Sequence, residues 1–372
     1  MEIKYQCNDC GKKYDPQEFV LKCTCGGMLN IEKSTLSFSK DEINKEEWSL
    51  FRYLKSMPFD SDFTLWKDIT MGEGMTAVVP YDNSNPSLLV KMDYMMPTLS
   101  FKDRGAAVLI AKAKELGVTK VIQDSSGNAG NAIAAYAARA GIECEIYVPE
   151  GTSPKKIKMI SSHGAKVNMI PGTREDTAKV ALNAVLREKV FYASHVYNPF
   201  FYEGTKTYAY EIFEQLNGNI PETIVVPVGN GTLLLGAYYG FKEMLDLGWI
   251  DKLPRFIAVQ ADGCAPIYEA FIKEETDIKA VISTGTKAEG IAIANPLRGK
   301  QILSAIRETG GIVITAPEEE ITNAQQRLAK KGFYVEPTTA ATFAGYFEYI
   351  KNNPIEGRVL IPLCGAGLKS DK

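Results

Sequence analysis

The stretch Lys120-Val-Ile-Gln-Asp-Ser-Ser-Gly-Asn-Ala-Gly130 contains the pattern that decides the fold. Its first four residues predict a short strand, and the small and polar residues after them are typical of a loop. An alanine-rich segment from Asn131 to Ala140 then has helical spacing, and Gly141 ends it. A strand, a loop of small residues and a helix form the repeating unit of a parallel sheet covered by helices.

The same alternation continues on both sides of this stretch, from Leu88 to the end of the chain. The predicted strands are 120–123, 143–148, 166–170, 223–226, 255–259, 311–314 and 358–361. The predicted helices include 103–116, 131–140, 203–216, 318–331 and 339–351. We therefore expect an α/β fold of two doubly wound, mostly parallel α/β domains, with functional residues at the carboxyl ends of the strands.

Composition and pattern divide the chain into four predicted segments. Residues 1–35 are rich in cysteine and form a zinc-ribbon-like segment, and residues 36–92 form the N-terminal part of the large domain. Residues 93–200 form the smaller α/β domain, and residues 201–372 form the rest of the large α/β domain.

The composition is that of an ordinary globular protein of 372 residues, 45% of them hydrophobic. The net charge of -3 is nearly balanced and no basic stripe is present, so we expect no nucleic acid and no membrane as partner. No segment approaches the ~18 apolar residues of a membrane span. The N-terminus lacks the apolar core of a signal peptide, so we expect a cytoplasmic protein with reduced cysteines.

Four of the seven cysteines lie within the first 25 residues, in the pattern C-x2-C-G followed by C-x-C-G-G. These candidate metal ligands are Cys7, Cys10, Cys23 and Cys25. The pattern resembles a small zinc ribbon, in which glycines let backbone amides turn toward the thiolates. The second pair is one residue closer than the usual C-x2-C, and a metal-free or redox-labile cluster is the alternative. Four thiolates leave no open coordination position, so the zinc would be structural.

Lys102 lies in Met96-Pro-Thr-Leu-Ser-Phe-Lys-Asp-Arg-Gly105, where a predicted strand is followed by a predicted helix. A lysine forms an imine only while its amine is neutral, and a helix N-terminus with Arg104 nearby favours the neutral form. A solvated lysine at the start of a helix is the alternative for any lysine taken alone. The interpretation of Lys102 as a catalytic, imine-forming lysine therefore depends on the loops that follow.

The loop Asp124-Ser-Ser-Gly-Asn-Ala-Gly130 precedes a predicted helix. Ser125 and Ser126 could simply cap that helix. However, Gly127 lets a ligand approach the backbone, amides at a helix start bind carboxylates, and Asn128 can donate to a phenolate-like oxygen. The composition of the loop favours a ligand-binding role, provided that Lys102 is catalytic.

Two further loops follow predicted strands. In Pro227-Val-Gly-Asn-Gly-Thr-Leu233, small residues expose several N–H groups at a helix start, and Thr232 adds a hydroxyl, which predicts a phosphate site. This loop lacks the lysine of a Walker loop and the third glycine of a dinucleotide loop. In Pro362-Leu-Cys-Gly-Ala-Gly-Leu-Lys369, Cys364 is either a buried thiol or a group that faces a heterocycle nitrogen. A thiol would not hold a pyridine ring protonated, which favours elimination over transamination.

These motifs together resemble the fold-type II pyridoxal phosphate enzymes, which are tryptophan synthase β-like, and within them the threonine synthase family. The resemblance covers nearly the whole chain and includes Gly72-Glu-Gly-Met-Thr76, Asn198-Pro199 and Val335-Glu-Pro337. It implies a lyase of amino-acid biosynthesis with pyridoxal 5'-phosphate, a small amino-acid substrate and a homodimer. The cofactor-binding residues it implies are Lys102, Asn128, Gly229, Asn230, Gly231, Thr232 and Cys364. The substrate-binding residues it implies are Ser125, Ser126, Gly127 and Ala129.

One departure from the family pattern concerns the substrate. Threonine synthases usually carry Asn-Pro-Tyr-Arg-Leu-Glu-Gly, whose arginine helps to bind the phosphate of O-phosphohomoserine, whereas this chain reads Asn198-Pro-Phe-Phe-Tyr-Glu-Gly204. Phe201 therefore stands at the arginine position, and a phenyl ring cannot replace a bidentate donor.

Three functions remain open. The first is conversion of O-phosphohomoserine and water to threonine and phosphate, by elimination and β-addition. The second is a serine/threonine ammonia-lyase (dehydratase) or a β-replacement enzyme, which explains Phe201, Ala129 and Cys364 better. The third is a non-catalytic protein that keeps the fold and uses the cysteine-rich segment to bind a partner.

Overall fold

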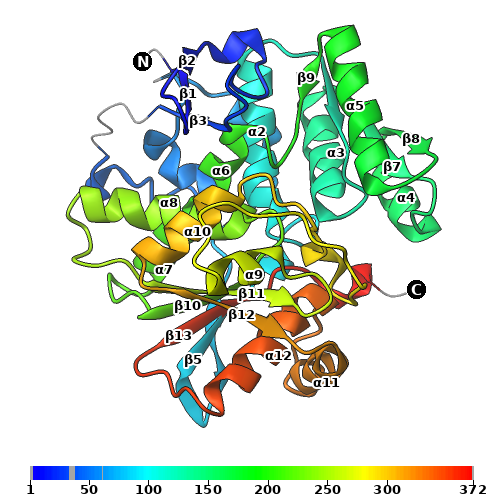
Figure 1. The fold of residues 1–372 in the computed structure, drawn as a ribbon. Helices are drawn as coiled ribbons and strands as arrows, with labels where there is room; N and C mark the ends of the chain where they lie inside the picture. Colours follow the sequence, from blue (N-terminus) through cyan, green and yellow to red (C-terminus); the bar gives the residue numbers. More distant parts are fainter. Residues whose placement is uncertain (1–2, 33–37, 61, 371–372) are drawn as a thin grey trace. The chain divides into compact units, whose positions relative to one another are not determined.

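The computed structural model describes residues 3–32, 38–60 and 62–370, and their contacts group into two compact units (Figure 1). The first unit contains Met1–Gly74 and Lys102–Thr205, and the second contains Met75–Phe101 and Lys206–Lys372. Residues 38–74 thus group with the first unit, although the sequence assigns them to the large domain. The domain boundaries drawn from the sequence stay a prediction.

A four-stranded parallel sheet in the order β8-β7-β6-β9 is the centre of the first unit. Its strands are β6 (Lys120–Gln123), β7 (Glu143–Pro149), β8 (Lys166–Ile170) and β9 (Phe191–Tyr192). Ile146 of β7 lies against Gly130 of α3 (Asn128–Ala140), whereas Tyr147 packs into the core with α5 (Arg174–Glu188). Because neighbouring residues of a strand face opposite sides, the two helices cover opposite faces of the sheet.

The rest of the first unit surrounds this sheet. Its remaining helices are α1 (Trp66–Ile69), α2 (Lys102–Glu115), α4 (Pro154–Ser161) and α6 (Pro199–Thr205). Helix α2 packs against both α3 and α6. The N-terminal residues form a small antiparallel sheet in the order β2-β1-β3, and β3 contacts α6. These short strands are β1 (Tyr5–Cys7), β2 (Lys13–Tyr14) and β3 (Leu29–Ile31).

A six-stranded sheet in the order β12-β11-β10-β13-β5-β4 is the centre of the second unit. All neighbours pair in parallel except β4 and β5. The strands are β4 (Val78–Asp82), β5 (Asn85–Lys91), β10 (Thr223–Pro227), β11 (Arg255–Ala261), β12 (Ile312–Ala316) and β13 (Val359–Pro362). The helices are α7 (Thr207–Gln215), α8 (Thr232–Asp246), α9 (Pro266–Ile272), α10 (Gly299–Glu308), α11 (Glu318–Lys330) and α12 (Pro337–Ile350).

The two faces of this sheet carry different helices. Ile257 and Val259 of β11 pack with α11 and α12 in one apolar core. The side chains of neighbouring strand residues point to opposite faces, so Phe256 lies on the face opposite Ile257. There it contacts Phe241 of α8, with the ring centroids 6.4 Å apart. The expected fold class, two mostly parallel α/β units with helices on both faces of each sheet, is therefore confirmed.

One predicted element is wrong. The segment 203–216 was expected to be a single helix, but α6 ends at Thr205 and α7 begins at Thr207. Gly204 lies directly against the backbone of α2, where a Cβ would be 2.0 Å from the carbonyl oxygen of Arg104. The ammonium of Lys206, in contrast, pairs with Glu243 of α8 at 3.2 Å. Packing against different elements thus separates the two helices within a continuous helical pattern.

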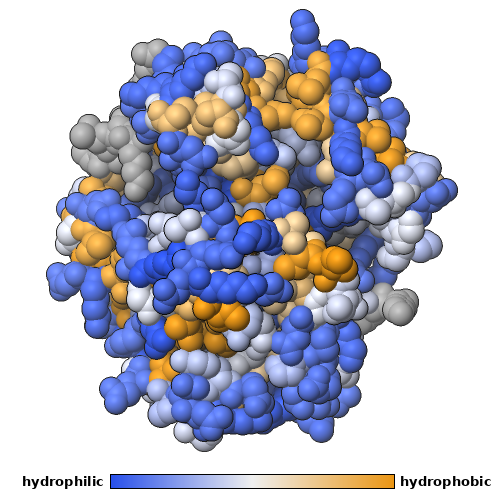
Figure 2. Space-filling model, viewed as in Figure 1, coloured by the Kyte–Doolittle hydropathy of each residue, from blue (hydrophilic) through white to orange (hydrophobic). Residues whose placement is uncertain are grey.

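The surface carries apolar side chains only in small separate groups on the face shown in Figure 2, with hydrophilic residues over most of the rest. Single exposed apolar side chains are normal for globular proteins. In the part of the chain that the structure describes, no helix has the length and apolar character needed to cross a membrane.

Candidate functional site

Lys102 is the first residue of α2, as the sequence predicted, and its side chain is half-buried. The residues that follow it, Asp103 to Ala113, are all buried, so α2 is an internal helix whose N-terminus carries the lysine. The positive end of the helix dipole lies at this N-terminus and disfavours a second positive charge. The position therefore suits an amine that must react in its neutral form.

Phe201 of α6 forms an apolar surface beside this lysine. The centroid of its ring is 5.8 Å from Lys102 Nζ, and the side chain is fully buried. A Cβ on Gly105 would lie 2.4 Å from the ring, so the glycine is what allows α2 and α6 to approach each other here. The phenylalanine at this position therefore fills a packed space and offers no hydrogen-bond donor to an anion.

His195 also contacts Phe201, with the two ring centroids 5.9 Å apart. Its Nδ1 is 3.5 Å from Nε2 of Gln123, the last residue of β6, which also donates to the carbonyl of Ala193 at 3.0 Å. Burial, followed by the positive charge of Lys102, holds the pKa of His195 well below its ordinary value. A neutral imidazole thus lies near Lys102.

The loop after β6 places the predicted substrate residues at the start of α3. Ser125 Oγ accepts a hydrogen bond from the N–H of Gly127 at 3.3 Å, and α3 begins at Asn128. The N-cap residue of α3 is Gly127, which has no side chain to cap the helix. The first amides of a helix lie at its positive end and can bind a carboxylate.

Gly130 in the first turn of α3 fixes the shape of this loop. A Cβ there would lie 1.8 Å from the carbonyl oxygen of Ser125, so any larger residue would push the loop away from the helix. Ala129 is buried directly beside it. Contacts from Lys102 to Phe201, from Phe201 to His195 and from His195 to Gln123 connect the lysine with the strand that precedes this loop.

In the second unit, the predicted phosphate loop follows β10 and ends at α8. Gly231 has a φ of +73°, and a Cβ there would be 2.4 Å from Ile302 Cδ1. A Cβ on Gly229 would be 2.8 Å from Ile293 Cγ1. Asn230 lies half-buried between these glycines. Both glycines are thus required by close packing, and the loop turns its backbone sharply into the first turn of α8.

Thr232 is the first residue of α8, a helix of 15 residues without a side-chain cap in the described structure. The N–H of Leu235 is the first to bond back into the helix, to the carbonyl of Gly231 at 2.8 Å. The amides before Leu235 and the Thr232 hydroxyl lie at the positive end of a long helix. This donor set suits a phosphate group.

Cys364 follows β13 and is fully buried. Its N–H donates to Thr339 Oγ1 of α12 at 3.0 Å, and its thiol lies 3.8 Å from the carbonyl oxygen of Pro362. Its carbonyl accepts a hydrogen bond from the N–H of Phe101 at 3.0 Å. Phe101 directly precedes Lys102 in the chain, so the turn that carries Cys364 holds the last residue before the lysine.

Glu336, the residue before α12, is a neighbour of Cys364 that the sequence analysis did not assign. A Cβ on Gly365 would lie 2.4 Å from its carboxyl group, and the N–H of Glu336 donates to the Gly365 carbonyl at 2.9 Å. This turn therefore contains a carboxylate as well as a thiol. The Glu-Pro pair at the helix start was visible in the sequence, but nothing in the pattern placed it beside residue 365.

The second unit brings its predicted residues to one edge of the sheet. β10, β13 and β5 are parallel neighbours, so their carboxyl ends lie together (Figure 1). The phosphate loop follows β10, Cys364 follows β13, and the segment that leads to Lys102 follows β5. The assignment of these residues to a cofactor stays a prediction.

The four N-terminal cysteines form one cluster in the first unit. The Sγ atoms of Cys7 and Cys25 are 3.6 Å apart, those of Cys10 and Cys23 3.4 Å, and those of Cys10 and Cys25 3.5 Å. All four lie within 4.8 Å of one another, and none forms a disulfide. Four thiolates around a tetrahedral zinc with 2.3 Å bonds are about 3.8 Å apart, so the residues fit this ion.

Known proteins resemble this chain along almost its whole length. The family model described as "Pyridoxal-phosphate dependent enzyme" matches residues 69–365. A threonine synthase of Methanocaldococcus jannaschii is 37% identical over 98% of this chain and 92% of that protein. A threonine synthase of Methanosarcina acetivorans is 35% identical over 91% of this chain and 85% of that protein.

Solved structures agree with the fold. Maize serine racemase superimposes with a TM-score of 0.69 at 20% identity, over 79% of this chain and 88% of that one. A pyridoxal 5'-phosphate-dependent aspartate racemase superimposes with a TM-score of 0.70 at 23% identity, over 81% of this chain and 93% of that one. At such identities the likeness extends to the fold alone.

Proposed function

The chain belongs to the family of pyridoxal-phosphate-dependent enzymes, and we propose that it is a lyase that converts O-phosphohomoserine and water to threonine and phosphate. The observation that carries the proposal is the 37% identity to a threonine synthase over 98% of the chain, cysteine-rich start included. The two racemase structures support only the fold, because their identity to this chain is too low to transfer a cofactor or a substrate.

The residues present fit the cofactor. The packed glycines and the uncapped start of α8 form a cradle of N–H donors for its phosphate, to which Thr232 adds a hydroxyl. Asn128 would hydrogen-bond the ring hydroxyl, and Cys364 would face the ring nitrogen. Bound pyridoxal phosphate supplies an electron sink that stabilises negative charge beside the amino group of the substrate.

Lys102 would hold the cofactor and would act as the base at the α-carbon of the substrate. Its position at the N-terminus of a buried helix, where the helix dipole disfavours a second positive charge, favours the neutral form of the amine. The neutral His195 adds no competing positive charge. The lysine can thus accept the α-proton and return a proton at a neighbouring carbon.

The loop after β6 would bind the substrate carboxylate. The N-cap residue of α3, Gly127, has no side chain, and Ser125, Ser126, Gly127 and Ala129 lie next to the first turn in the sequence. Carboxylate binding at a helix N-terminus fixes the orientation of the amino acid, so that its α-hydrogen faces the lysine. The substrates of both candidate functions are amino acids, so the loop would have this role in either of them.

A serine/threonine ammonia-lyase or a β-replacement enzyme is the second candidate, because Phe201 offers no donor to a substrate phosphate. Incubation of the purified protein with O-phosphohomoserine, serine and threonine separately distinguishes the two. The proposal predicts equal amounts of threonine and phosphate from O-phosphohomoserine. Ammonia from serine or threonine, without phosphate release from O-phosphohomoserine, would reject it in favour of the second candidate.

We also propose that Cys7, Cys10, Cys23 and Cys25 hold one structural zinc ion. Their mutual distances and the lack of a disulfide support a closed four-thiolate site. Elemental analysis should find one zinc per chain. The double variant Cys10→Ser/Cys25→Ser should lose it, and the single variant Cys144→Ser, at a buried cysteine outside the cluster, should keep it.

A homodimer in the cytoplasm completes the proposal. The near-balanced charge fits an enzyme that handles small metabolites and no polymer. Sedimentation equilibrium should give twice the 41.0 kDa chain mass, and cell fractionation should recover the protein with the cytosol.

A further inference from the structure

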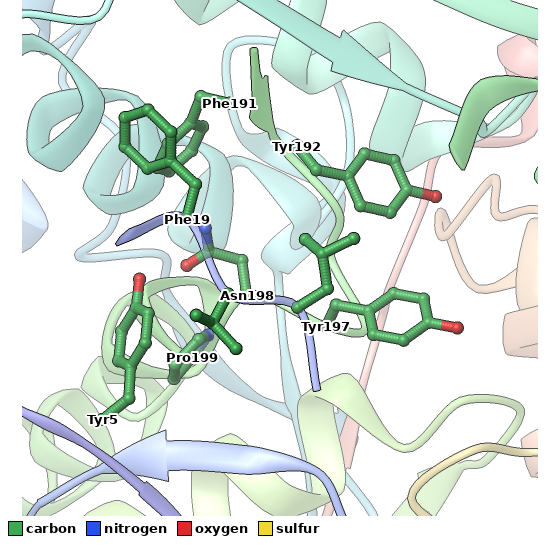
Figure 3. Close-up of a pocket in the computed structure, with 9 residues that line it drawn as sticks. Tyr5, Phe19, Phe191, Tyr192, Tyr197, Asn198 and Pro199 are labelled. Carbon is green, nitrogen blue, oxygen red and sulfur yellow. The ribbon is translucent and has the colours of Figure 1, made fainter. Parts of the chain in front are cut away.

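The N-terminal cysteine ribbon, residues 3–32, packs directly on the segment that leads to Phe201. Tyr5 of β1 and Phe200 of α6 have ring centroids 5.7 Å apart, and Phe19 meets Phe191 edge to face at 5.4 Å. Figure 3 shows Phe19 beside Phe191, and Tyr5 beside Pro199. Aromatic pairs of this kind contribute beyond their buried area and fix the relative positions of their partners.

Both arms of the ribbon take part in this contact. Tyr5 lies two residues before Cys7, and Lys22, directly before Cys23, places its Nζ 5.3 Å from the centroid of the Tyr197 ring. Leu21 packs against the core under α5. A pocket between the ribbon and residues 191–199 is lined by Tyr5, Phe19 and Leu21 from the ribbon and by Phe191 and Tyr197 from the segment (Figure 3). The two surfaces therefore face each other through aromatic and apolar side chains.

Helix α6, which contacts the ribbon, also contacts Lys102. Phe200 contacts the ribbon, and the next residue, Phe201, lies over Gly105 with its ring centroid 5.8 Å from Lys102 Nζ. Both phenylalanines are completely buried. Helix α6 thus contacts Tyr5 of the ribbon through Phe200 and Lys102 through Phe201.

The ribbon depends on its cysteine cluster for its own fold. Its strands have only three, two and three residues, too few for a stable sheet without a further constraint. A four-thiolate zinc site supplies such a constraint, since metal binding and folding are coupled in modules of this size. Loss of the metal would free Tyr5 and Phe19 from their positions against α6 and β9.

We propose that the zinc-loaded ribbon positions α6, so that Tyr5 is a positioning residue that acts on Lys102 through Phe200 and Phe201. The inference rests on the proposed metal site and cofactor but not on the identity of the substrate. It assigns the ribbon a part in substrate handling in addition to its contribution to stability. The metal content of the protein would then control how well Lys102 is aligned with its reaction partners.

The test compares two variants of the holoenzyme, Tyr5→Leu and Phe63→Leu. Phe63 is a buried aromatic residue of the same unit, stacked on Phe59 at 4.4 Å, and it belongs neither to the ribbon nor to α6. Tyr5→Leu should keep one zinc per chain and its cofactor. It should alter the visible circular dichroism of the cofactor and raise KM at least about fivefold, with kcat less affected. Phe63→Leu should lower Tm without either change.

A second arm removes zinc from the wild type with a chelator and restores it with Zn²⁺. The dichroism should change on removal of zinc and recover on its addition, and Tyr5→Leu should show a smaller change because its contact is already broken.

Unchanged dichroism and KM in Tyr5→Leu, or the same changes in Phe63→Leu, would overturn the inference. Because the dichroism requires no turnover, a protein that forms no threonine would reject the proposed reaction and still test the ribbon. Absence of bound zinc would reject the metal site and this inference, but not the enzyme.

Discussion

At the scale of single residues, the site depends on what surrounds Lys102. A lysine at a helix start is common, but here the helix is buried, a phenyl ring lies 5.8 Å from the amine, and the nearby histidine is neutral. These surroundings suit a lysine that reacts as a free amine. They also explain Phe201, which packs over Gly105 in a space that a charged guanidinium could enter only at a large desolvation cost.

Replacement of Lys102 by alanine should remove the visible absorbance of the lysine-bound cofactor and lower kcat by about a thousandfold or more, because no other group can form the imine. Absorbance spectra and steady-state rates of the purified variant provide the measurement. Lys114→Ala, in the last turn of the same helix, should keep both properties. A visible band that persisted in Lys102→Ala would show that the cofactor is held elsewhere.

Glu73 gives a prediction about pH. It is fully buried and accepts hydrogen bonds from Tyr136, Thr70 and the Met71 N–H, and burial raises its pKa to about 7. The Glu73 carboxyl therefore keeps its proton up to about pH 7 in the folded protein, but releases it above about pH 4.5 in the unfolded chain. Its protonation stabilises the fold fully below pH 4.5, and this contribution is lost as the pH rises through 7.

The stabilising contribution is on the order of 3 kcal/mol at low pH. Glu73→Gln, which cannot titrate, should make the free energy of unfolding less dependent on pH between 5 and 8. Urea denaturation at several pH values measures this, with the wild type losing stability relative to the variant as pH rises. Parallel pH profiles for the two proteins would show that Glu73 titrates normally.

At the scale of elements, the contact between α2 and α6 determines where the lysine lies. Gly105 is one point of close approach, and Gly105→Ala should cost about 1–3 kcal/mol in the free energy of unfolding despite the better helix propensity of alanine. Gly151→Ala, where a Cβ meets nothing within 4 Å, should change stability by less than about 0.5 kcal/mol. Equal stability of the two variants in urea would contradict the packing described for Phe201.

Helix α8 offers a matched pair of glycines for the phosphate loop. Gly231 before its first turn and Gly248 after its end have φ values of +73° and +69°, but only Gly231 is crowded, by Ile302. Both alanine variants should be less stable because of backbone strain, by about 1 kcal/mol or more. Gly231→Ala alone should also weaken cofactor binding, about tenfold or more in a fluorescence titration. An unchanged cofactor Kd in Gly231→Ala would remove this loop from the phosphate site.

The sequence predicted these elements unevenly. Strands 120–123 and 166–170 and the start of α11 at residue 318 agree with the structure, because periodicity and turn residues coincide there. The helix 203–216 is broken because its two halves pack on different helices, which a local pattern does not contain. For the same reason the sequence missed Glu336 beside Gly365 and Gln123 beside His195: each pair is separated by many residues and joined only by the fold.

At the scale of the whole molecule, the chain passes between its two units at three places that coincide with the motifs of the sequence. The first division falls after Gly74, within Gly72-Glu-Gly-Met-Thr76, and the second after Phe101, directly before Lys102. The third falls after Thr205, one residue beyond Glu203-Gly204. Three of the quoted motifs thus lie at or next to the positions where the chain leaves one unit and enters the other.

The central claim is that phosphate leaves by cleavage of its carbon–oxygen bond and that water then adds to the β-carbon. The most direct test is a reaction of O-phosphohomoserine in ¹⁸O-labelled water, with mass analysis of both products and Lys102→Ala as the control. We predict one ¹⁸O atom in the hydroxyl of threonine, none in the released phosphate, and no product from the variant. Labelled phosphate accompanied by homoserine, or no consumption of O-phosphohomoserine by the wild type, would contradict the account.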